Sequence, residues 1–263
     1  MNKFRQREQL KMIHIGKRLG KIYDRITPYT TYFRDHALYN TFKFRFGIKF
    51  THWRHHMEIL RDPYMYFYFP PKEGNTIIDI GAQYGDYAIL WAKHFQAKVI
   101  AFEPLSENFG EMFDDCALND VLSVSLDKLD NGNVDCQKYF VGDGNPITFK
   151  QSGNMASKQE DGEKEDTITL DDFIQQNQYV VEPNIIKIDV EGFEMEVLKG
   201  AVNTLKTFHP KIIIETHSKE LRRQCHEFLE SLGYDLYFEG RTIKTKGWMD
   251  EVTNLFYAHS ETF

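Results

Sequence analysis

A short glycine-bounded segment follows the first strongly apolar run of the chain. The run Thr76–Ile80 is rich in β-branched residues, and Gly81 and Gly85 follow it with three residues between them. Gly81 would allow a tight turn from a strand into a helix, and Gly85 would let a ligand approach the backbone closely. The spacing is G-x-x-x-G, not the G-x-G-x-x-G of dinucleotide-binding enzymes. Asp86 would repel a pyrophosphate, so a ligand with a neutral or cationic centre fits this segment better than a dinucleotide does. A glycine turn that binds no ligand is the alternative.

An acid ends the second apolar run. Glu103 stands 18 residues after Gly85, between the run Lys98–Phe102 and Pro104. In an open α/β sheet, a carboxylate at this place can accept hydrogen bonds from both hydroxyls of a ribose. A solvated Glu before a proline turn is the alternative, and the glycine segment upstream favours the ribose.

Three ionisable side chains gather at the end of a third apolar run, Ile185–Asp189. Lys187 and Asp189 are two residues apart and would point to one face of a strand, with Glu191 in the turn that follows. Buried charges need partners. An internal ion pair of Lys187 that only shapes the loop is therefore the alternative to a role in chemistry.

Strands that alternate with helices must position these residues. A further strand is predicted at Lys211–Glu215, and others at Gln137–Val141, Tyr234–Phe238 and Asn254–Ala258. Helices are predicted at Asp86–Phe95, Ser106–Cys116 with Ser106 as its cap, Thr169–Gln176 with a cap at its start, Glu194–Phe208, and Lys219–Leu232 with Gly233 as its C-cap. The polar segment Ser152–Asp166 is expected to form a surface loop. The alternation implies a mainly parallel sheet with helices on both faces, which binds ligands beyond the carboxyl ends of its strands.

The charge of the chain divides unevenly along its length. Residues 1–62 carry 14 Lys and Arg against 5 Asp and Glu, a balance of +9, whereas the rest carries 18 against 34, a balance of −16. Pro63 and Pro70-Pro71 separate the two parts. We therefore expect a basic, aromatic-rich, mainly helical extension over residues 1–70 and a separate domain over residues 71–263. A cap over the substrate entrance, docking to an anionic membrane or glycan, nucleic-acid binding and an oligomer contact are the roles open to the extension.

Several classes of protein are not supported by the sequence. The longest uncharged stretch is far shorter than the ~18 residues that cross a bilayer, and the N-terminus lacks a secretory signal. Cys116, Cys136 and Cys225 show no C-x-x-C pairing, which indicates reduced thiols in a cytoplasmic protein. His52 and His56 have no accompanying third ligand, so no metal site is predicted.

The motifs in their order resemble a known family. IDIGAQYG, IAFEP, TLDDFI, IIKIDVEGFEMEVLKGA and IIIETH resemble the FkbM-type S-adenosylmethionine-dependent methyltransferases over about Thr76–Gly233. The resemblance implies the class I methyltransferase (Rossmann-like) fold, with seven mostly parallel strands and an antiparallel last pair. It also implies S-adenosylmethionine as cofactor and methyl transfer to a hydroxyl oxygen of a sugar, a glycan or another small hydroxylated metabolite.

The same resemblance implies roles for individual residues. Asp143, in a Gly-Asp turn after the expected third strand, could contact the adenine amino group. Lys187, Asp189 and Glu191 match the motif of the fourth strand, and Glu215 and His217 match an acid-x-His after the fifth. The cofactor residues implied are Asp79, Gly81, Ala82, Gln83, Gly85, Glu103, Pro104 and Asp143.

An acceptor hydroxyl must lose its proton during or after methyl transfer, so a general base would assist. Asp189, Glu191 and His217 are the candidates, and His217 has the most suitable unperturbed pKa, about 6.5; a surface histidine capping the next helix is its alternative. Asp189 and Glu191 could also bind a divalent metal, although none is predicted. A catalytically silent S-adenosylmethionine-binding module and a nicotinamide-dependent oxidoreductase are the other functions left open, as is the oligomeric state.

Overall fold

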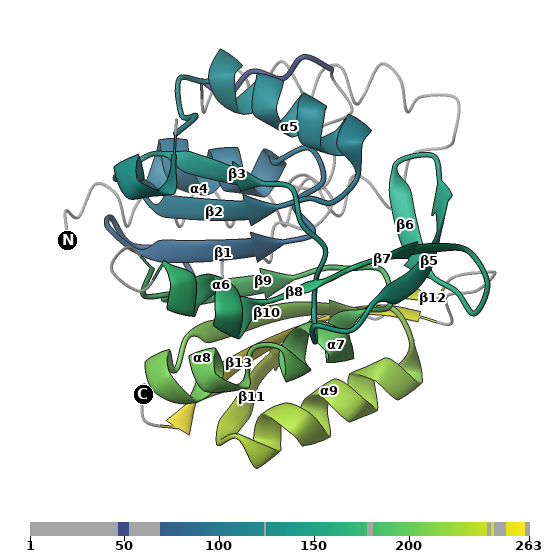
Figure 1. Ribbon diagram of the computed structural model, residues 1–263. Helices are drawn as coiled ribbons and strands as arrows, with labels where there is room; N and C mark the ends of the chain where they lie inside the picture. Colours follow the sequence, from purple (N-terminus) through teal and green to yellow (C-terminus); the bar gives the residue numbers. More distant parts are fainter. Residues whose placement is uncertain are drawn as a thin grey trace, which may run out of the picture. The chain divides into compact units, whose positions relative to one another are not determined.

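The computed structural model describes residues 47–52, 69–123, 125–177, 181–240, 243–244 and 251–260 (Figure 1). The chain divides into two units, Met1–Pro70 and Pro71–Phe263. Most of the first unit lies outside the described residues, and so does most of the segment predicted to be helical. The helical extension over residues 1–70 therefore stays a prediction, and every element below belongs to the second unit.

A mainly parallel sheet forms the centre of the second unit. Its strands lie in the order β11-β13-β10-β9-β1-β2-β3, and β12 pairs with β13 as an eighth strand. β13 is antiparallel to β10 and β11, whereas the other pairs along the order are parallel. The class I methyltransferase arrangement with an antiparallel last pair is thus confirmed. The bounds are β1 Thr76–Ile80, β2 Lys98–Phe102, β3 Val134–Gln137, β9 Ile185–Ile188, β10 Lys211–Thr216, β11 Tyr234–Glu239, β12 Ile243–Lys244 and β13 Glu251–His259.

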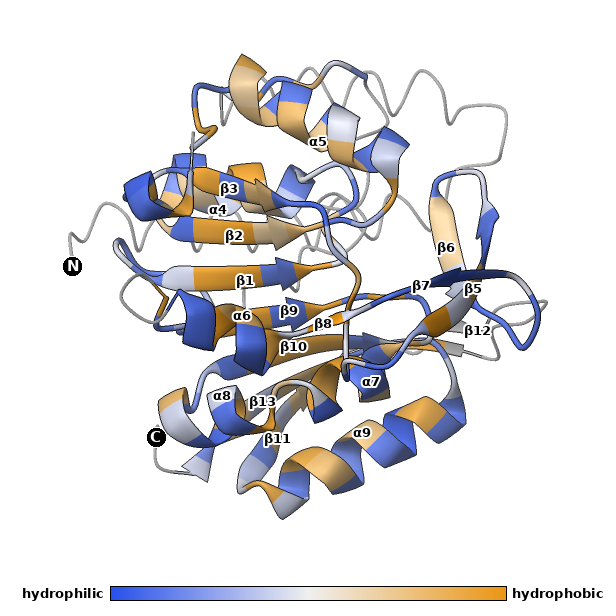
Figure 2. Ribbon diagram, in the orientation of Figure 1, coloured by the Kyte–Doolittle hydropathy of each residue, from blue (hydrophilic) through white to orange (hydrophobic). Residues whose placement is uncertain are grey.

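Helices cover both faces of this sheet, because its central strands are apolar on both sides (Figure 2). One main cluster joins alternate strand residues such as Ile78, Ile80 and Ile188 to apolar side chains of four helices. These are α6 (Leu170–Gln176), α7 (Glu194–Lys199), α8 (Val202–Phe208) and α9 (Lys219–Ser231). The helices α4 (Asp86–Phe95) and α5 (Ser106–Leu118) pack against the β1–β3 part of the sheet.

A small antiparallel sheet stands at the carboxyl ends of the central strands (Figure 1). Its order is β6-β5-β7, with β5 at Ile147–Ser152, β6 at Met155–Lys158 and β7 at Glu163–Glu165. We call residues 147–165 the flap. The prediction of a surface loop over Ser152–Asp166 is wrong, because backbone pairing between strands holds even these polar residues in an extended form.

Two other predicted elements differ from the structure. The third strand is Val134–Gln137 and not Gln137–Val141; Val141–Gly142 forms β4, which pairs with β8 (Ile168–Thr169) outside the main sheet. The helix predicted over Glu194–Phe208 is two helices that meet at Gly200. A side chain at Gly200 would lie 1.9 Å from the carbonyl oxygen of Gly142, so the break lets β4 pass close by.

The predicted helix caps have mixed outcomes. The hydroxyl of Thr169 accepts a hydrogen bond from the Asp172 amide at 2.9 Å, and Gly233 adopts a left-handed φ of 85° after α9, as predicted. Ser106 is not a cap, because α5 begins at Ser106 itself and its cap position, Leu105, offers no side-chain hydrogen bond.

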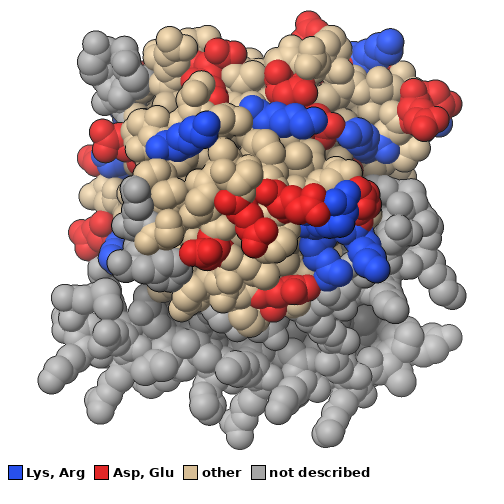
Figure 3. Space-filling view, turned by 90° about the horizontal axis from the view of Figure 1, so that it is seen from below, with Lys and Arg blue, Asp and Glu red and all other residues tan. Residues whose placement is uncertain are grey.

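The three cysteines are free thiols, in agreement with the prediction. Among the described residues, no helix combines the length and the apolar composition that crossing a bilayer requires. Acidic and basic side chains are intermixed on the face of the molecule seen from below (Figure 3). On α9, for example, Arg223 pairs with both Glu220 and Glu227.

Candidate functional site

The loop after β1 is held by the two strands that flank β1. The amides of Gly81 and Ala82 donate to the carbonyl oxygen of Phe102 at 3.0 and 2.9 Å. Gly81 has a φ of 81°, and a side chain there would lie 1.8 Å from the carbonyl oxygen of Asp189. Only glycine fits, and the loop therefore lies against the ends of both β2 and β9.

Gly85 is the N-cap residue of α4, the helix that follows the loop. It has a left-handed φ of 73°, and a side chain there would lie 2.7 Å from Cγ of Met112 on α5. The close packing of α4 against α5 is thus a reason for this glycine besides the predicted approach of a ligand. Asp86 is buried in the first turn of α4, where its carboxylate accepts a hydrogen bond from the amide of Tyr87.

Glu103 is buried at the end of β2 and faces the loop. Its Oε2 accepts from the amide of Gln83 at 3.0 Å, and its Oε1 accepts from the amide of Leu105 and from Nδ2 of Asn108 at 3.0 and 3.1 Å. Burial raises the pKa of Glu103 to about 7, although these three hydrogen bonds oppose the rise. A solvated Glu before a proline turn, the alternative reading, is therefore wrong; Pro104 beside it is half-buried.

Asp79 and Lys187 face each other across β1 and β9. They are direct partners in the register, and Nζ of Lys187 lies 3.2 Å from Oδ1 of Asp79 and 3.6 Å from Oδ2 of Asp189. Nζ also donates to the carbonyl oxygen of Gly81 at 3.2 Å. Burial raises the pKa of Asp79, and Lys187 opposes that rise. The ion pair considered for Lys187 thus exists, with Asp79 as an additional partner. Through its hydrogen bond to Gly81, Lys187 also holds the loop that follows β1.

A buried histidine collects four carboxylates at the ends of β9 and β10. Nδ1 of His217 lies 2.7 Å from Oε1 of Glu194. Nε2 lies 3.6, 3.4 and 3.7 Å from carboxylate oxygens of Asp189, Glu191 and Glu215. Burial by itself lowers the pKa of His217, but the hydrogen bond and charge of Glu194, with Asp189 and Glu191, raise it to about 10. The alternative of a surface histidine is wrong.

The turn after β9 gives Glu191 its position. Glu191 has a left-handed φ of 53° and Gly192 one of 108°. The amide of Gly192 donates to Oε1 of Glu194 at 3.0 Å, so the turn, Glu194 and His217 form one connected network. Sequence reasoning did not single out Glu194; the only available signal was another acid three residues after Glu191.

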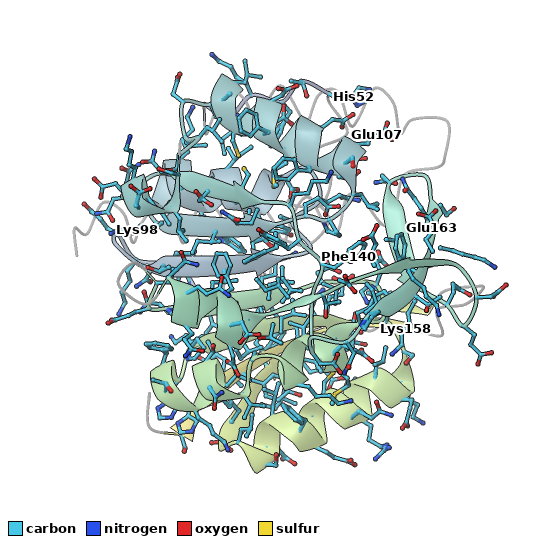
Figure 4. The ribbon with its side chains drawn as sticks, in the orientation of Figure 1. His52, Lys98, Glu107, Phe140, Lys158 and Glu163 are labelled. Carbon is cyan, nitrogen blue, oxygen red and sulfur yellow. The ribbon has the colours of Figure 1, made fainter. Side chains whose placement is uncertain are left out.

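The flap packs over the same edge of the sheet, where Figure 4 places Lys158 and Glu163. Ile147 and Phe149 of β5 form a small apolar cluster with Leu105, which follows β2, and Phe193, which follows β9. Nδ2 of Asn108 donates to the carbonyl oxygen of Asn154 at 2.9 Å, so one amide group links Glu103 to the flap.

A lysine fixes the far side of the flap. The amide of Lys158 donates to the carbonyl oxygen of Glu191 at 3.3 Å, and Nζ of Lys158 pairs with Glu196 at 2.6 Å. The sequence predicts none of these flap contacts, because its polar composition indicates a loop over this segment.

Asp143 is the one predicted site residue whose place in the sheet differs. It follows β4, outside the main sheet, and its Oδ1 accepts from the amide of Asn145 at 3.1 Å. The strand that placed Asp143 at the sheet edge was predicted in the wrong segment. Its contact with adenine stays a prediction without that support.

The part of the chain that contains these residues is similar to known proteins. A family model described as the methyltransferase FkbM domain matches residues 79–236. The hexuronic acid methyltransferase AglP of Haloferax volcanii is 27% identical over 150 residues, which cover 56% of this chain and 58% of that protein. This chain thus spans less than two thirds of that relative. Methyltransferase 1 of Beauveria bassiana is 25% identical over 203 residues, 70% of this chain and 81% of that protein.

Among solved structures, this chain is similar to a methyltransferase FkbM from Methylobacillus flagellatus KT. The two share 14% sequence identity, and their structures align with a TM-score of 0.47 over 84% of this chain and 59% of that one.

Proposed function

The chain belongs to the FkbM family of methyltransferases, and on this premise we propose that it methylates a hydroxyl oxygen of a sugar, a glycan or another small hydroxylated metabolite, with S-adenosylmethionine as methyl donor. One observation carries the proposal. The carboxylate of Glu103 and the carboxylates around His217 stand at one edge of a parallel sheet, on either side of the loop Gly81–Gly85. A relative named as a hexuronic acid methyltransferase supports a sugar as acceptor.

The residues around Glu103 fit the ribose of the cofactor. Oε2 of Glu103 accepts one described hydrogen bond, from Gln83, and a carboxylate oxygen can accept two. The backbone of Gly81, Ala82 and Gln83 would line the same place, and Pro104 follows Glu103. Asp79 would contribute indirectly, because it pairs with Lys187, which donates a hydrogen bond to the carbonyl oxygen of Gly81. The bound cofactor would supply an electrophilic methyl group on a positively charged sulfur.

The residues on the other side of the loop fit the acceptor. The side chains of Asp189 and Glu191 are 17% and 24% exposed, so they can contact a bound hydroxyl, whereas that of His217 is only 2% exposed. Either carboxylate can orient the hydroxyl in line with the methyl group and take its proton as the oxygen–carbon bond forms. His217 and Lys187 would then act chiefly by holding these carboxylates.

The remaining expectations belong to the same proposal. We place the reaction in the cytoplasm and assign residues 1–70 to acceptor entry or to docking on an anionic surface, since the net charge of this part is +9 (14 − 5). The family match leaves no support for the nicotinamide-dependent oxidoreductase. A silent cofactor-binding module remains as the rival that the experiment must exclude.

The test has two stages. Calorimetry should detect binding of S-adenosylhomocysteine and none of NAD; comparable NAD affinity would overturn the cofactor. The chain is then incubated with isotopically labelled S-adenosylmethionine and a panel of sugars, hexuronic acids and hydroxylated metabolites. Label in an acceptor supports the enzyme, with mass spectrometry of the product locating the methyl group. Cofactor binding without label in any acceptor, from metabolite extracts included, supports the silent module instead.

A further inference from the structure

We propose that Asp189, Glu215 and His217 bind a divalent cation, and that this cation holds oxygen atoms of the acceptor. The sequence alone predicted no metal site. The role toward the acceptor rests on the proposed function, whereas the binding of the cation rests only on the geometry of these three side chains.

The first argument is the spacing of the donor atoms. One atom from each of the three side chains lies within 4.8 Å of the other two. Nε2 of His217 lies 3.6 and 3.7 Å from oxygens of Asp189 and Glu215, beyond the usual length of a hydrogen bond. Metal–ligand bonds of about 2.0–2.2 Å at tetrahedral angles put two ligands about 3.5 Å apart. The two distances measured from Nε2 therefore suit ligands around one ion.

The second argument is the group behind the histidine. Metal-binding histidines usually donate their other ring N–H to a carboxylate, which holds the ring so that Nε2 faces the metal once an incoming cation has displaced the Nε2 proton. Glu194 is fully buried and lies 2.7 Å from Nδ1 of His217, while the amide of Gly192 fixes the same Glu194 oxygen. The imidazole itself is buried and directs Nε2 into the group of carboxylates. This arrangement is independent of the acids that would contact the ion.

The donor set indicates the kind of cation. One imidazole nitrogen with carboxylate oxygens suits Mn²⁺, Fe²⁺ or Zn²⁺, whereas Mg²⁺ and Ca²⁺ prefer oxygen alone. Asp189 and Glu215 are partly exposed, at 17% and 20%, so the ion would have open positions on the acceptor side. A hydroxyl or carboxylate of a sugar could fill them, and the charge of the ion would make a bound hydroxyl more acidic.

Cation binding can be measured on the full chain without any turnover. The protein is freed of metal with a chelator and titrated with Mn²⁺, and free Mn²⁺ is followed by electron paramagnetic resonance. We expect one equivalent to bind, and Zn²⁺ to displace it. Glu215→Gln and Asp189→Asn should each weaken binding at least about 10-fold, and Glu194→Gln by about 10- to 100-fold through the histidine. Glu227→Gln on the exposed face of α9 is the matched control and should change nothing.

The outcomes separate this inference from the proposed function. Absence of stoichiometric binding in the wild-type chain, or equal affinity in Glu215→Gln and Glu227→Gln, overturns the cation site. Thermal unfolding of each variant is recorded beside the titration, and Glu215→Gln, at a partly exposed strand end, decides the matter if another variant does not fold. Binding of S-adenosylhomocysteine is measured on the same samples. Cation binding without cofactor binding would leave the site intact and reject the methyl-transfer proposal.

Discussion

At the scale of the residue, Glu103 connects the fold to the proposed ligand. Burial raises its pKa to about 7, above its usual 4.5, so the free protein takes up a proton there as the pH falls through 7. The sign follows: the raised pKa favours the protonated folded state, so this group's contribution to the free energy of unfolding falls as pH rises from 4.5 through 7. The ribose hydroxyls would bind best to the charged carboxylate. Cofactor binding should therefore strengthen as the pH rises, whereas the contribution of Glu103 to folding stability falls.

Cofactor affinity should therefore weaken as the pH falls below 7. One pH unit below the pKa only about a tenth of the protein is charged at Glu103, so the dissociation constant of S-adenosylhomocysteine should rise about 10-fold. Glu103→Gln should abolish this dependence, and Glu103→Ala should cost very roughly 1.5–3 kcal/mol of binding at pH 8. Calorimetry across pH measures both; an unchanged constant in Glu103→Ala would show that Glu103 does not hold the ribose.

The acids of the acceptor side should affect turnover and not cofactor binding. Asp189→Asn and Glu191→Gln remove charge but keep volume, and each should reduce methyl transfer by roughly 10²–10⁴ if that carboxylate accepts the proton. His217→Asn should do the same, but it also leaves Glu194 buried without its partner. Rates and S-adenosylhomocysteine affinity are compared in each variant. Wild-type turnover in all three would mean that positioning alone accounts for catalysis.

Lys187 should matter first for stability. Lys187→Met leaves Asp79 buried without its cation, and breaking a buried pair in this way costs about 3–5 kcal/mol. Adding Asp79→Asn to Lys187→Met should recover part of the loss, because the buried charge is then gone as well. Urea unfolding of the wild type and the two variants gives the values. A loss of activity in Lys187→Met with unchanged stability would make Lys187 a contact of the substrate instead.

The positions of the candidate residues are most predictable where a strand end fixes the side chain. Glu103, Lys187, Asp189 and Glu191 follow or end strands whose apolar runs are plain in the sequence, and the structure brings all four to one edge. Glu194 was missed because its role depends on a turn with positive φ at Glu191, which no local pattern announces.

At the scale of the element, the sheet was predictable and the flap was not. β1, β2 and α4 have the predicted bounds because their apolar runs are almost wholly buried. β3 contains Asp135 and Cys136 and is held by pairing with β2, a contact distant in the sequence. The flap strands β6 and β7 are also polar, and they too form because they pair with a neighbouring strand. Such pairing overrides the local preference of polar residues for a loop.

The flap should open without unfolding the sheet. Phe149 belongs to a small apolar cluster separate from the main one, and truncating a buried Phe costs about 3–5 kcal/mol where the site cannot collapse. In Phe149→Ala, hydrogen exchange should become fast in β5 and β6 but stay slow in β1, and the KM for the acceptor should rise. Phe173→Ala, in the main cluster, is the control and should lower protection throughout. Loss of protection in β1 of Phe149→Ala would show that the flap and the sheet form one cooperative unit.

At the scale of the whole molecule, the chain joins parts of opposite charge. Residues 1–62 carry +9 and the remainder −16. Every strand of the sheet and every residue of the proposed sites lies within Pro71–Phe263. In the proposed function, cofactor binding therefore belongs to the second unit, and the basic part would serve acceptor delivery or attachment to a surface.

A chain shortened to Pro71–Phe263 tests this division. It should unfold cooperatively and bind S-adenosylhomocysteine with unchanged affinity, because no proposed cofactor contact precedes Asp79. It should lose turnover of the acceptor or, if the basic part docks on lipid, co-sedimentation with phosphatidylserine vesicles. Each Lys or Arg near such a surface contributes about 1 kcal/mol, so full-length binding should fall steeply with added salt. Vesicles of phosphatidylcholine are the control for charge. A shortened chain that folds but cannot bind the cofactor would mean that residues before Pro71 complete the cofactor site, and equal turnover and vesicle binding in both chains would leave the basic part without either role.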